Sequence, residues 1–387
     1  MRVGVASHGA IGHIYPLLGF ADALLVAGHD VIILTSSDLT ALLTELGYAA
    51  EAVGETVGWG LAQVQSRYPE LTTSLPAEQA WRLDAELFAD ALPRAMAPAL
   101  VTAFSSRRPD LVLYESTNLG AALAAAELDI PAVCLDLWAV GCWHVKRSEL
   151  AQRISAVWAE RSAVPLTFDP LLGRAHLDPA PPSLRNPAGT EGNSIRMPTR
   201  QIAWGDPRIS LTSWLTRHHS RPVVYLTLGT VGWGTVDLLR DVLAGLAELP
   251  VDVLVAIGSY FEPSQLGPLP DSVWVERFVR QDLVLPHVDL AVHHGGSGTL
   301  LGAAAEGLPQ LVTPMGADQF QNSEALAFSG AGVALPQGSV TAAAVQDGVR
   351  QLIDDPNYRA AAYRIRGEIL ALPTPADRID DLIALLP

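Results

Sequence analysis

Cysteine and basic residues are both scarce in this chain of 387 residues. Its two cysteines, Cys134 and Cys142, cannot build a disulfide scaffold or a cysteine-based zinc site, and two thiols are typical of the reducing cytosol. Lys and Arg number 25 against 41 Asp and Glu, so the formal net charge is −16. Nucleic acids and anionic membranes attract proteins with a basic face, and we expect neither as a partner.

Long apolar runs are missing as well. The Ala- and Leu-rich stretch 119–126 ends at Glu127, and no stretch reaches the ~18 uninterrupted apolar residues that span a bilayer. The first residues, MRVGVASHG, lack the charged-then-apolar pattern of a secretory signal peptide. We therefore expect a soluble, cytoplasmic protein without stable membrane insertion.

Hydrophobic residues are abundant instead. They make up 49% of the chain, which favours a large buried core and excludes a disordered or fibrous protein. At roughly 150 residues per domain, the length indicates two or three domains. Short apolar runs alternate with helical patterns, which is typical of βαβ units and parallel sheets. The predicted strands are 2–6, 31–34, 111–113, 132–135, 223–228, 251–257, 273–275, 290–293 and 311–313.

A proline-rich stretch, 178–207, interrupts this alternation. Prolines cannot continue a helix or a central strand, so we interpret the stretch as an interdomain connection. The predicted organisation is a first domain at 1–205, a second domain at 208–372, and a C-terminal helix in 373–387 that could dock back on the first domain. Two α/β domains of similar size favour a ligand cleft between them, at the carboxyl ends of the strands.

A glycine-rich turn, Gly295-Gly-Ser-Gly-Thr299, follows the apolar strand 290–293 and precedes a helical pattern. Glycines allow close approach of a ligand, and the N–H groups and dipole of a helix start suit a phosphate. The turn lacks the lysine of a P-loop and the spacing of a dinucleotide fingerprint or a nucleophile elbow. A zinc site at His293 and His294 lacks spaced partners. A packed turn without a ligand stays the structural alternative.

A second polar pair follows the strand 311–313. Asp318 and Gln319 are adjacent in a predicted loop at the end of this strand. A neighbouring carboxylate and amide can bind two adjacent sugar hydroxyls. The alternative for Asp318 is a helix N-cap.

Together, HHGGSGT and GLPQLVTPMGADQFQN closely resemble the donor-binding motif of family 1 glycosyltransferases, above all the bacterial enzymes that glycosylate natural products such as macrolides, enediynes and aromatic polyketides. The segments 12–16, 27–31 and 226–230 extend the resemblance to nearly the whole chain. The resemblance implies the GT-B fold, in which two Rossmann-like domains face a cleft, with the donor held mainly by the second domain.

The resemblance also implies roles for single residues. For the diphosphate it implies contacts with His293, Gly296, Ser297, Gly298 and Thr299, and with Thr230 from another loop. For the sugar it implies contacts with Asp318 and Gln319. For the nucleotide base it implies stacking on Phe278 and a contact with the backbone of Val279. Two positions depart from the pattern. Arg280 replaces a usual proline, and Leu301 replaces a ribose-binding Glu of the plant members. An apolar Leu301 favours a TDP-sugar over a UDP-sugar as the donor.

His13, after the first strand, is the candidate catalytic base. Histidine has a pKa of about 6.5 and can take the proton of an acceptor hydroxyl that attacks the anomeric carbon. A helix-capping role for His13, or His8 as the base, is the alternative. A carboxylate usually orients such a histidine; the resemblance points to Glu115, and Asp136 is the alternative. The implied reaction is an in-line displacement with inversion. No D-x-D motif is present, so neither a metal nor another cofactor is expected besides the nucleotide-sugar co-substrate.

Tryptophans gather in the first predicted domain and suit a flat, hydrophobic aglycone as the acceptor. The candidates are Trp59, Trp81, Trp138 and Trp143, with core packing as the alternative for each. Other functions stay open: a nucleotide-sugar 2-epimerase, a transferase acting on lipid-linked cell-wall sugar, or a non-catalytic auxiliary protein that resembles a transferase. A homodimer also stays open.

Overall fold

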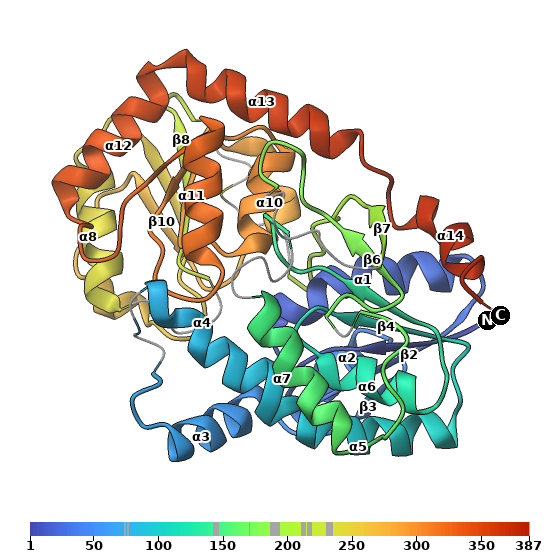
Figure 1. Cartoon of the computed structure of the whole chain (residues 1–387). Helices are drawn as coiled ribbons and strands as arrows, with labels where there is room; N and C mark the ends of the chain where they lie inside the picture. Colours follow the sequence, from blue (N-terminus) through green and yellow to red (C-terminus); the bar gives the residue numbers. More distant parts are fainter. Residues whose placement is uncertain are drawn as a thin grey trace. The chain divides into compact units, whose positions relative to one another are not determined.

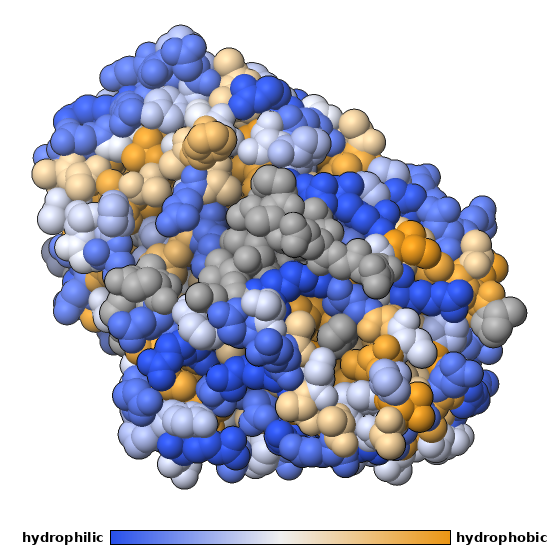
Figure 2. Space-filling model, in the orientation of Figure 1, coloured by the Kyte–Doolittle hydropathy of each residue, from blue (hydrophilic) through white to orange (hydrophobic). Residues whose placement is uncertain are grey.

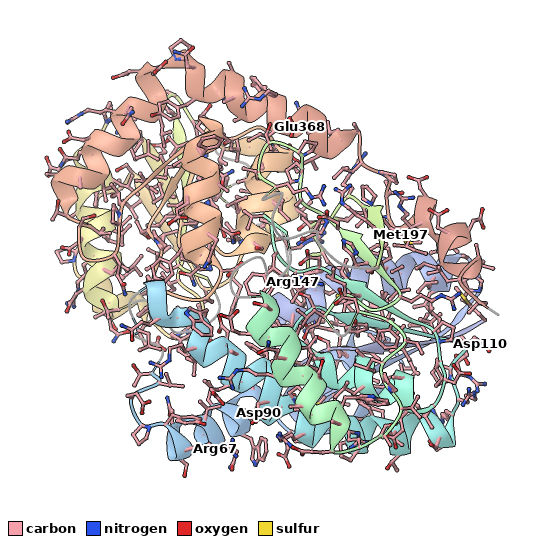
Figure 3. All side chains as sticks on the ribbon, in the orientation of Figure 1. Arg67, Asp90, Asp110, Arg147, Met197 and Glu368 are labelled. Atoms are coloured by element: carbon pink, nitrogen blue, oxygen red, sulfur yellow. The ribbon has the colours of Figure 1, made fainter. Side chains whose placement is uncertain are left out.

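The computed structural model describes residues 1–72, 75, 77–141, 147–169, 171–185, 194–209, 214, 219–229 and 235–386. The chain divides into two compact units, 1–180 with 186–202 and 372–387, and 181–185 with 203–371. Residues 181–185, which the sequence placed in the first domain, belong to the second unit because the Ser183 backbone N–H and hydroxyl donate to Glu368 at 2.8 and 2.6 Å (Figure 3). Residues 372–387 belong to the first unit, where the Arg378 side chain donates to the Pro198 carbonyl at 3.0 Å.

The first unit is built on a seven-stranded sheet with the order β3-β2-β1-β4-β5-β6-β7, and all its strand pairs are parallel. The strands are β1 Arg2–Ala6, β2 Asp30–Thr35, β3 Ala50–Ala52, β4 Leu111–Glu115, β5 Ala132–Leu135, β6 Ala175–Asp178 and β7 Ile195–Pro198. The strand order reverses between β1 and β4. Loops that leave such a point in opposite directions open a crevice at the carboxyl edge of a parallel sheet.

Helices cover both faces of this sheet (Figure 1). They are α1 Ile11–Val26, α2 Ser37–Glu45, α3 Val57–Arg67, α4 Ala77–Glu86, α5 Leu92–Ser106, α6 Leu119–Glu127, α7 Arg147–Ala159 and α14 Ile379–Ile383, with the short 3₁₀ turn η6 Ala376–Arg378. A π-helical turn, η1 Leu87–Ala91, joins α4 to α5. Asp90 in this turn pairs with Arg67 of α3 at 3.2 Å and with Arg94 of α5 at 2.8 Å (Figure 3). These ion pairs connect η1 to its neighbouring helices.

One continuous helical run, 79–106, is long and apolar enough to cross a membrane, by length and composition only. Its second half, α5, packs against α6 in the first unit. Met96, Leu100 and Phe104 on α5 are fully or almost fully buried there, together with Val112 of β4. These three apolar residues of the run therefore belong to the core of the unit.

The second unit has a six-stranded parallel sheet with the order β10-β9-β8-β11-β12-β13. The strands are β8 Val223–Thr227, β9 Asp252–Ala256, β10 Val273–Glu276, β11 Leu290–His293, β12 Gln310–Val312 and β13 Gly332–Ala334. The helices are α8 Val236–Ala247, α9 Gln281–Val284, α10 Ser297–Ala305, α11 Gln319–Ser329, α12 Ala342–Asp354 and α13 Pro356–Leu370, with the 3₁₀ turns η4 Pro263–Leu266 and η5 Leu285–His287. Its strand order reverses between β8 and β11.

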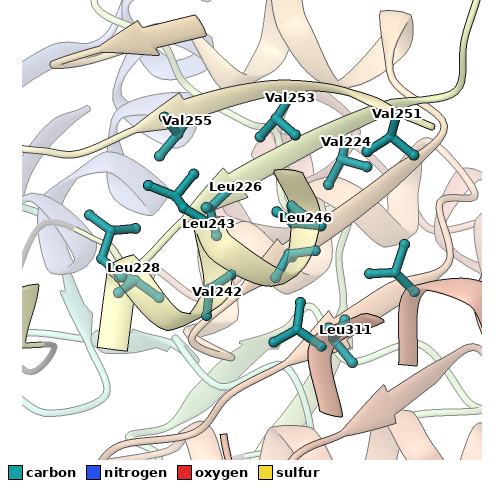
Figure 4. Close-up of a cluster of buried hydrophobic side chains, with 14 of the residues drawn as sticks. Val224, Leu226, Leu228, Val242, Leu243, Leu246, Val251, Val253, Val255 and Leu311 are labelled. Carbon is teal, nitrogen blue, oxygen red and sulfur yellow. The ribbon is translucent and has the colours of Figure 1, made fainter. Parts of the chain in front are cut away.

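Both faces of this second sheet are buried. Val224 and Leu226 of β8 lie in one core cluster with α8, whereas Tyr225 lies in another cluster on the opposite face. Figure 4 shows the first cluster, in which Leu243 and Leu246 of α8 pack over β8 and β9. A strand that is buried on both faces appears in the sequence as a continuous apolar run, as predicted for 223–228. The prediction of two α/β domains with parallel sheets is thus confirmed.

Figure 2 shows one face of the molecule, on which hydrophilic residues cover most of the area and hydrophobic residues are scattered among them. Of the two cysteines, Cys134 is buried in β5, and Cys142 lies outside the described residues.

Candidate active site

The carboxyl edge of the first sheet brings His13 and Glu115 together at the reversal of strand order. His13 lies in the first turn of α1, after β1, and Glu115 is the last residue of β4. The His13 Nδ1 is 3.2 Å from the Glu115 Oε1, and the side chains are 23% and 0% exposed. The start of α1 has no side-chain cap, so His13 does not have the capping role that the sequence left open.

Thr117 joins this pair, which no sequence motif indicated. Its hydroxyl lies 3.0 Å from the His13 Nδ1, and 2.9 and 2.7 Å from the two Glu115 oxygens. The Thr117 backbone N–H donates to the Glu115 Oε2 at 2.6 Å, and the Thr117 carbonyl is 3.2 Å from the His8 Nε2. The last residue of β4 and a residue just after this strand therefore form one network with two histidines that follow β1.

Burial and charge act in opposite directions on Glu115. Burial alone would raise the pKa of this carboxyl group, but the neighbouring His13, with smaller effects of His8 and Thr117, lowers the pKa to about 2. Glu115 is therefore ionised at neutral pH. His8 is completely buried, and this burial lowers its pKa to about 4 in spite of the nearby Glu115. Because His8 is neutral at pH 7, Glu115 is the charged member of the network that faces His13.

Aromatic contacts complete the surroundings of His13. The Phe88 ring from η1 lies 6.0 Å from the His13 ring and 5.7 Å from the His8 ring, measured between centroids. π-Helical turns inside α-helices often occur at functional sites. Asp136, the alternative partner for His13, lies just after β5 and accepts a hydrogen bond from the Trp138 backbone N–H at 3.0 Å.

The tryptophans predicted to contact the acceptor lie around one hydrophobic core cluster. Trp59, Trp81 and Trp138 are partly buried and pack against the core cluster formed by α3, η1, α6 and α7. This is the core packing that the sequence left open for each of them, and contact with an acceptor stays a prediction. Trp143 lies outside the described residues.

In the second unit, the glycine turn follows β11 at the reversal of strand order. Gly295 has φ +93°, and a Cβ atom there would lie 2.8 Å from the Val312 Cγ1. Only glycine accommodates this backbone without strain. The next residue, Gly296, is the N-cap of α10, so Ser297, Gly298 and Thr299 form the first helical turn. The first N–H groups of an α-helix have no partner within the helix, and such N–H groups bind anions. Thr230, predicted to approach from the loop after β8, lies outside the described residues.

His293, predicted to contact the diphosphate, has partners for both ring nitrogens within the second unit, and the diphosphate contact stays a prediction. His293 is fully buried; its Nδ1 accepts a hydrogen bond from the Gly295 N–H at 3.0 Å, so its Nε2 carries the proton and donates to the Gln310 Oε1 at 2.7 Å. Burial lowers the His293 pKa to about 4. Both ring nitrogens are used within the second unit because the strand end that positions His293 is inside the core. In this structure His293 therefore shapes the glycine turn from beneath.

Asp318, Ser297 and Asn322 connect the glycine turn to α11. The Asp318 Oδ2 accepts hydrogen bonds from the Ser297 hydroxyl at 2.6 Å and from the Asn322 amide at 2.7 Å. The Asn322 amide also donates to the Gly295 carbonyl at 2.8 Å. Burial raises the Asp318 pKa, and these hydrogen bonds oppose the rise. Asp318 is the N-cap residue of α11, but its side chain makes no capping hydrogen bond.

Gln319 supports the loop before α11. Its Oε1 accepts hydrogen bonds from the Met315 and Gly316 N–H groups at 2.8 and 3.2 Å. The amide oxygen is thus used within the loop, and a contact of Gln319 with a sugar would have to come from its nitrogen. The roles of Asp318 and Gln319 toward a sugar stay predictions.

The segment after β10 carries the predicted base contacts. Phe278 is 41% exposed, whereas Val279 packs on the core cluster beneath β8. Arg280, in place of the usual proline, donates to Asp282 at 2.6 Å. Leu301, on which the preference for a TDP-sugar was based, is 5% exposed within α10. Among the described residues, no group of three or more His, Cys, Asp or Glu side chains is arranged to hold a metal ion.

Comparisons with known proteins place this geometry in a family. Residues 22–229 match the family model described as erythromycin biosynthesis protein CIII-like, N-terminal domain, and residues 240–385 match the corresponding C-terminal domain. An L-demethylnoviosyl transferase of Streptomyces niveus is 32% identical, over 99% of this chain and 98% of that protein. A 10-deoxymethynolide desosaminyltransferase of Streptomyces venezuelae is 30% identical, over 99% and 96%.

Solved structures agree. The glycosyltransferase VinC in complex with dTDP has a TM-score of 0.81 and 27% identity, covering 100% of this chain and 99% of that one. The Streptomyces sp. SF2575 glycosyltransferase SsfS6, complexed with thymidine diphosphate, has a TM-score of 0.80 and 26% identity, covering 99% of both chains. The predicted GT-B fold class and the predicted resemblance are thereby confirmed, and the chain belongs to the erythromycin biosynthesis protein CIII-like family, whose curated relatives are antibiotic glycosyltransferases.

Proposed function

We propose that this protein is an inverting glycosyltransferase that moves a sugar, above all a deoxysugar, from a TDP-sugar to a hydroxyl group of a hydrophobic natural-product aglycone. The observation that carries the proposal is the position of the His13 Nδ1 at 3.2 Å from the ionised, buried Glu115, at the reversal of strand order. A non-catalytic auxiliary protein would need no histidine with a carboxylate partner at this edge.

In the proposed mechanism His13 is the general base. A carboxylate at Nδ1 favours the tautomer with the proton on Nδ1 and the lone pair on Nε2. The Nε2 takes the proton of the acceptor hydroxyl while its oxygen attacks the anomeric carbon from the face opposite the leaving diphosphate. The imidazolium that forms is stabilised by Glu115, which stays ionised throughout.

The proposed donor contacts lie on the second unit. Phe278, exposed after β10, would stack on the thymine base, and the first turn of α10 would receive the diphosphate. The N-terminal end of α10 carries a partial positive charge, which suits the charge that develops on the leaving diphosphate. VinC and SsfS6, whose structures contain TDP, support thymidine as the nucleoside. No metal takes part in the proposed steps, because the chain has no D-x-D motif.

The proposal is tested in two stages. Calorimetric titration with TDP, UDP and NAD comes first, and we expect tight binding of TDP alone. Turnover is then measured with TDP-sugars and a panel of macrolactone and aromatic polyketide aglycones, with the anomeric configuration of the product determined by NMR. His13→Ala should keep its affinity for TDP and lose at least about 100-fold in turnover. Wild-type turnover in His13→Ala, or a retained anomeric configuration, would contradict the mechanism.

A further inference from the structure

We propose that Thr117 is a positioning residue, whose hydroxyl connects His13 to Glu115 by accepting the hydrogen bond of the Nδ1–H group and donating its own to the carboxylate. The inference rests on the proposed function only for its effect on turnover, because His13 acts as the base there. The arrangement itself is a property of the folded first unit.

The hydrogen count of Thr117 determines the direction of these bonds. A hydroxyl has one hydrogen to donate and two lone pairs with which to accept. Its oxygen lies within 3.0 Å of three atoms: the His13 Nδ1 at 3.0 Å and the Glu115 oxygens at 2.9 and 2.7 Å. An ionised carboxylate can only accept, so the hydroxyl hydrogen goes to Glu115. A lone pair of the hydroxyl then faces the His13 Nδ1.

The opposite direction is unfavourable. If the hydroxyl donated to the Nδ1, that nitrogen would carry no hydrogen, and two acceptor atoms, the Nδ1 and the charged Glu115 Oε1, would face each other at 3.2 Å. With the proton on the Nδ1, the His13, Thr117 and Glu115 atoms that meet here each have a complementary neighbour. The hydroxyl is also nearer to the Nδ1 than the carboxylate oxygen is, at 3.0 against 3.2 Å.

The backbone holds the hydroxyl in place. The Thr117 N–H donates to the Glu115 Oε2 at 2.6 Å, and the Thr117 carbonyl is 3.2 Å from the Nε2 of the buried His8. Thr117 is 3% exposed, so water does not readily replace its hydroxyl. The network remains in place during the proposed reaction, because the acceptor proton arrives at the His13 Nε2 and the Nδ1–H bond is not broken.

The first test is kinetic. Thr117→Val keeps the branched shape without the hydroxyl, whereas Thr117→Ser keeps the hydroxyl. We expect Thr117→Val to lower kcat at least ~10-fold with an unchanged KM for the TDP-sugar, and Thr117→Ser to restore kcat to within ~3-fold of wild type. Thr35→Val is the matched control: Thr35 is a buried threonine at the carboxyl end of β2, and its hydroxyl has no hydrogen-bond partner among the described residues.

The second test needs no turnover. In ¹⁵N-histidine-labelled protein, the His13 Nδ1–H signal is assigned by its loss in His13→Ala. A hydrogen-bonded Nδ1–H resonates downfield and exchanges slowly with water. In Thr117→Val this signal should move upfield and broaden by exchange, whereas Thr117→Ser and Thr35→Val should retain it.

The outcomes separate the two proposals. An unchanged Nδ1–H signal in Thr117→Val means that the Nδ1 donates directly to Glu115, which overturns the inference. The inference is also overturned if kcat of Thr117→Ser is as low as that of Thr117→Val, because the hydroxyl then has no effect on turnover. If no acceptor is ever glycosylated, the signal still tests Thr117, and only the proposed function fails. If Thr117→Val does not fold, as judged by circular dichroism, Thr117→Ala replaces it in both tests.

Discussion

The buried His293 makes a quantitative prediction about stability and pH. Its ordinary pKa of 6.5 falls to about 4 in the folded protein because burial disfavours the charged ring. The ring is neutral where it accepts from Gly295 and donates to Gln310, and protonation of the Nδ1 would place a hydrogen against the Gly295 N–H. The stabilisation due to His293 is therefore fully present above pH 6.5, and it is lost as the pH falls toward 4, because the unfolded chain binds the proton first.

The magnitude follows from linkage. The pKa of His293 is 6.5 in the unfolded chain and about 4 in the folded protein. A change from pH 7.5 to pH 5.0 therefore lowers the free energy of unfolding by about 2 kcal/mol through this one histidine. His293→Asn keeps an acceptor for the Gly295 N–H but cannot titrate. At pH 7.5 the variant should be less stable by about 1–3 kcal/mol, because the buried Gln310 oxygen loses its donor. At pH 5.0 this deficit should shrink by about 2 kcal/mol.

Urea unfolding of both proteins at the two pH values, followed by far-UV circular dichroism, measures these differences. His8, whose pKa is lowered to about 4, is the same in both proteins and cancels in the comparison. His293 contributes to the lowered pKa of His294, about 3, but burial is the larger cause, so His294 is neutral at both pH values in both proteins. His287→Asn, at an exposed position of the same unit, is the control for a histidine substitution as such. A deficit of equal size at pH 7.5 and pH 5.0 would refute the reasoning that His293 is held neutral by the fold.

Three other changes have expected outcomes. Glu115→Gln removes the charge beside His13, so turnover should fall about 10²–10⁴-fold while calorimetry finds unchanged TDP affinity; an equal loss of affinity would argue against a purely catalytic role. Gly295→Ala places a side chain on a backbone with φ +93° and against Val312, so the free energy of unfolding should fall by more than about 2 kcal/mol. Gly298→Ala is the control: its Cβ would meet nothing within 4 Å, and the free energy of unfolding should change by less than about 0.5 kcal/mol. Phe278→Ala should weaken TDP binding by about 1–3 kcal/mol without a change in melting temperature; unaltered calorimetric binding would remove the stacking role.

The fold could largely be predicted from the sequence, because a parallel strand buried on both faces appears as a continuous apolar run. The strands at 290–293 and 132–135 have the expected bounds. The strand β7, Ile195–Pro198, was missed because it lies in the proline-rich stretch interpreted as a connection. Among the described residues it is an edge strand paired with β6, and proline is tolerated at such an edge. The prolines of 178–207 therefore indicate correctly that this stretch forms no central strand, but they do not exclude an edge strand.

The candidate site shows a sharper limit, because a motif indicates which residues gather but not how their hydrogen bonds are shared. His293 belongs to the motif that pointed to a phosphate, yet its two ring nitrogens bind Gly295 and Gln310. Thr117 belongs to no motif, yet its hydroxyl lies 3.0 Å from a ring nitrogen that is 104 residues away in the chain. A hydroxyl or an imidazole can bind a ligand or orient a neighbour only with hydrogens and lone pairs that its existing hydrogen bonds do not use. The partners in those bonds come from other strands. The roles of Thr117 and Asn322 depend on such hydrogen bonds. They can therefore be recognised only in the folded structure, at the carboxyl edge of the sheet to which each residue belongs.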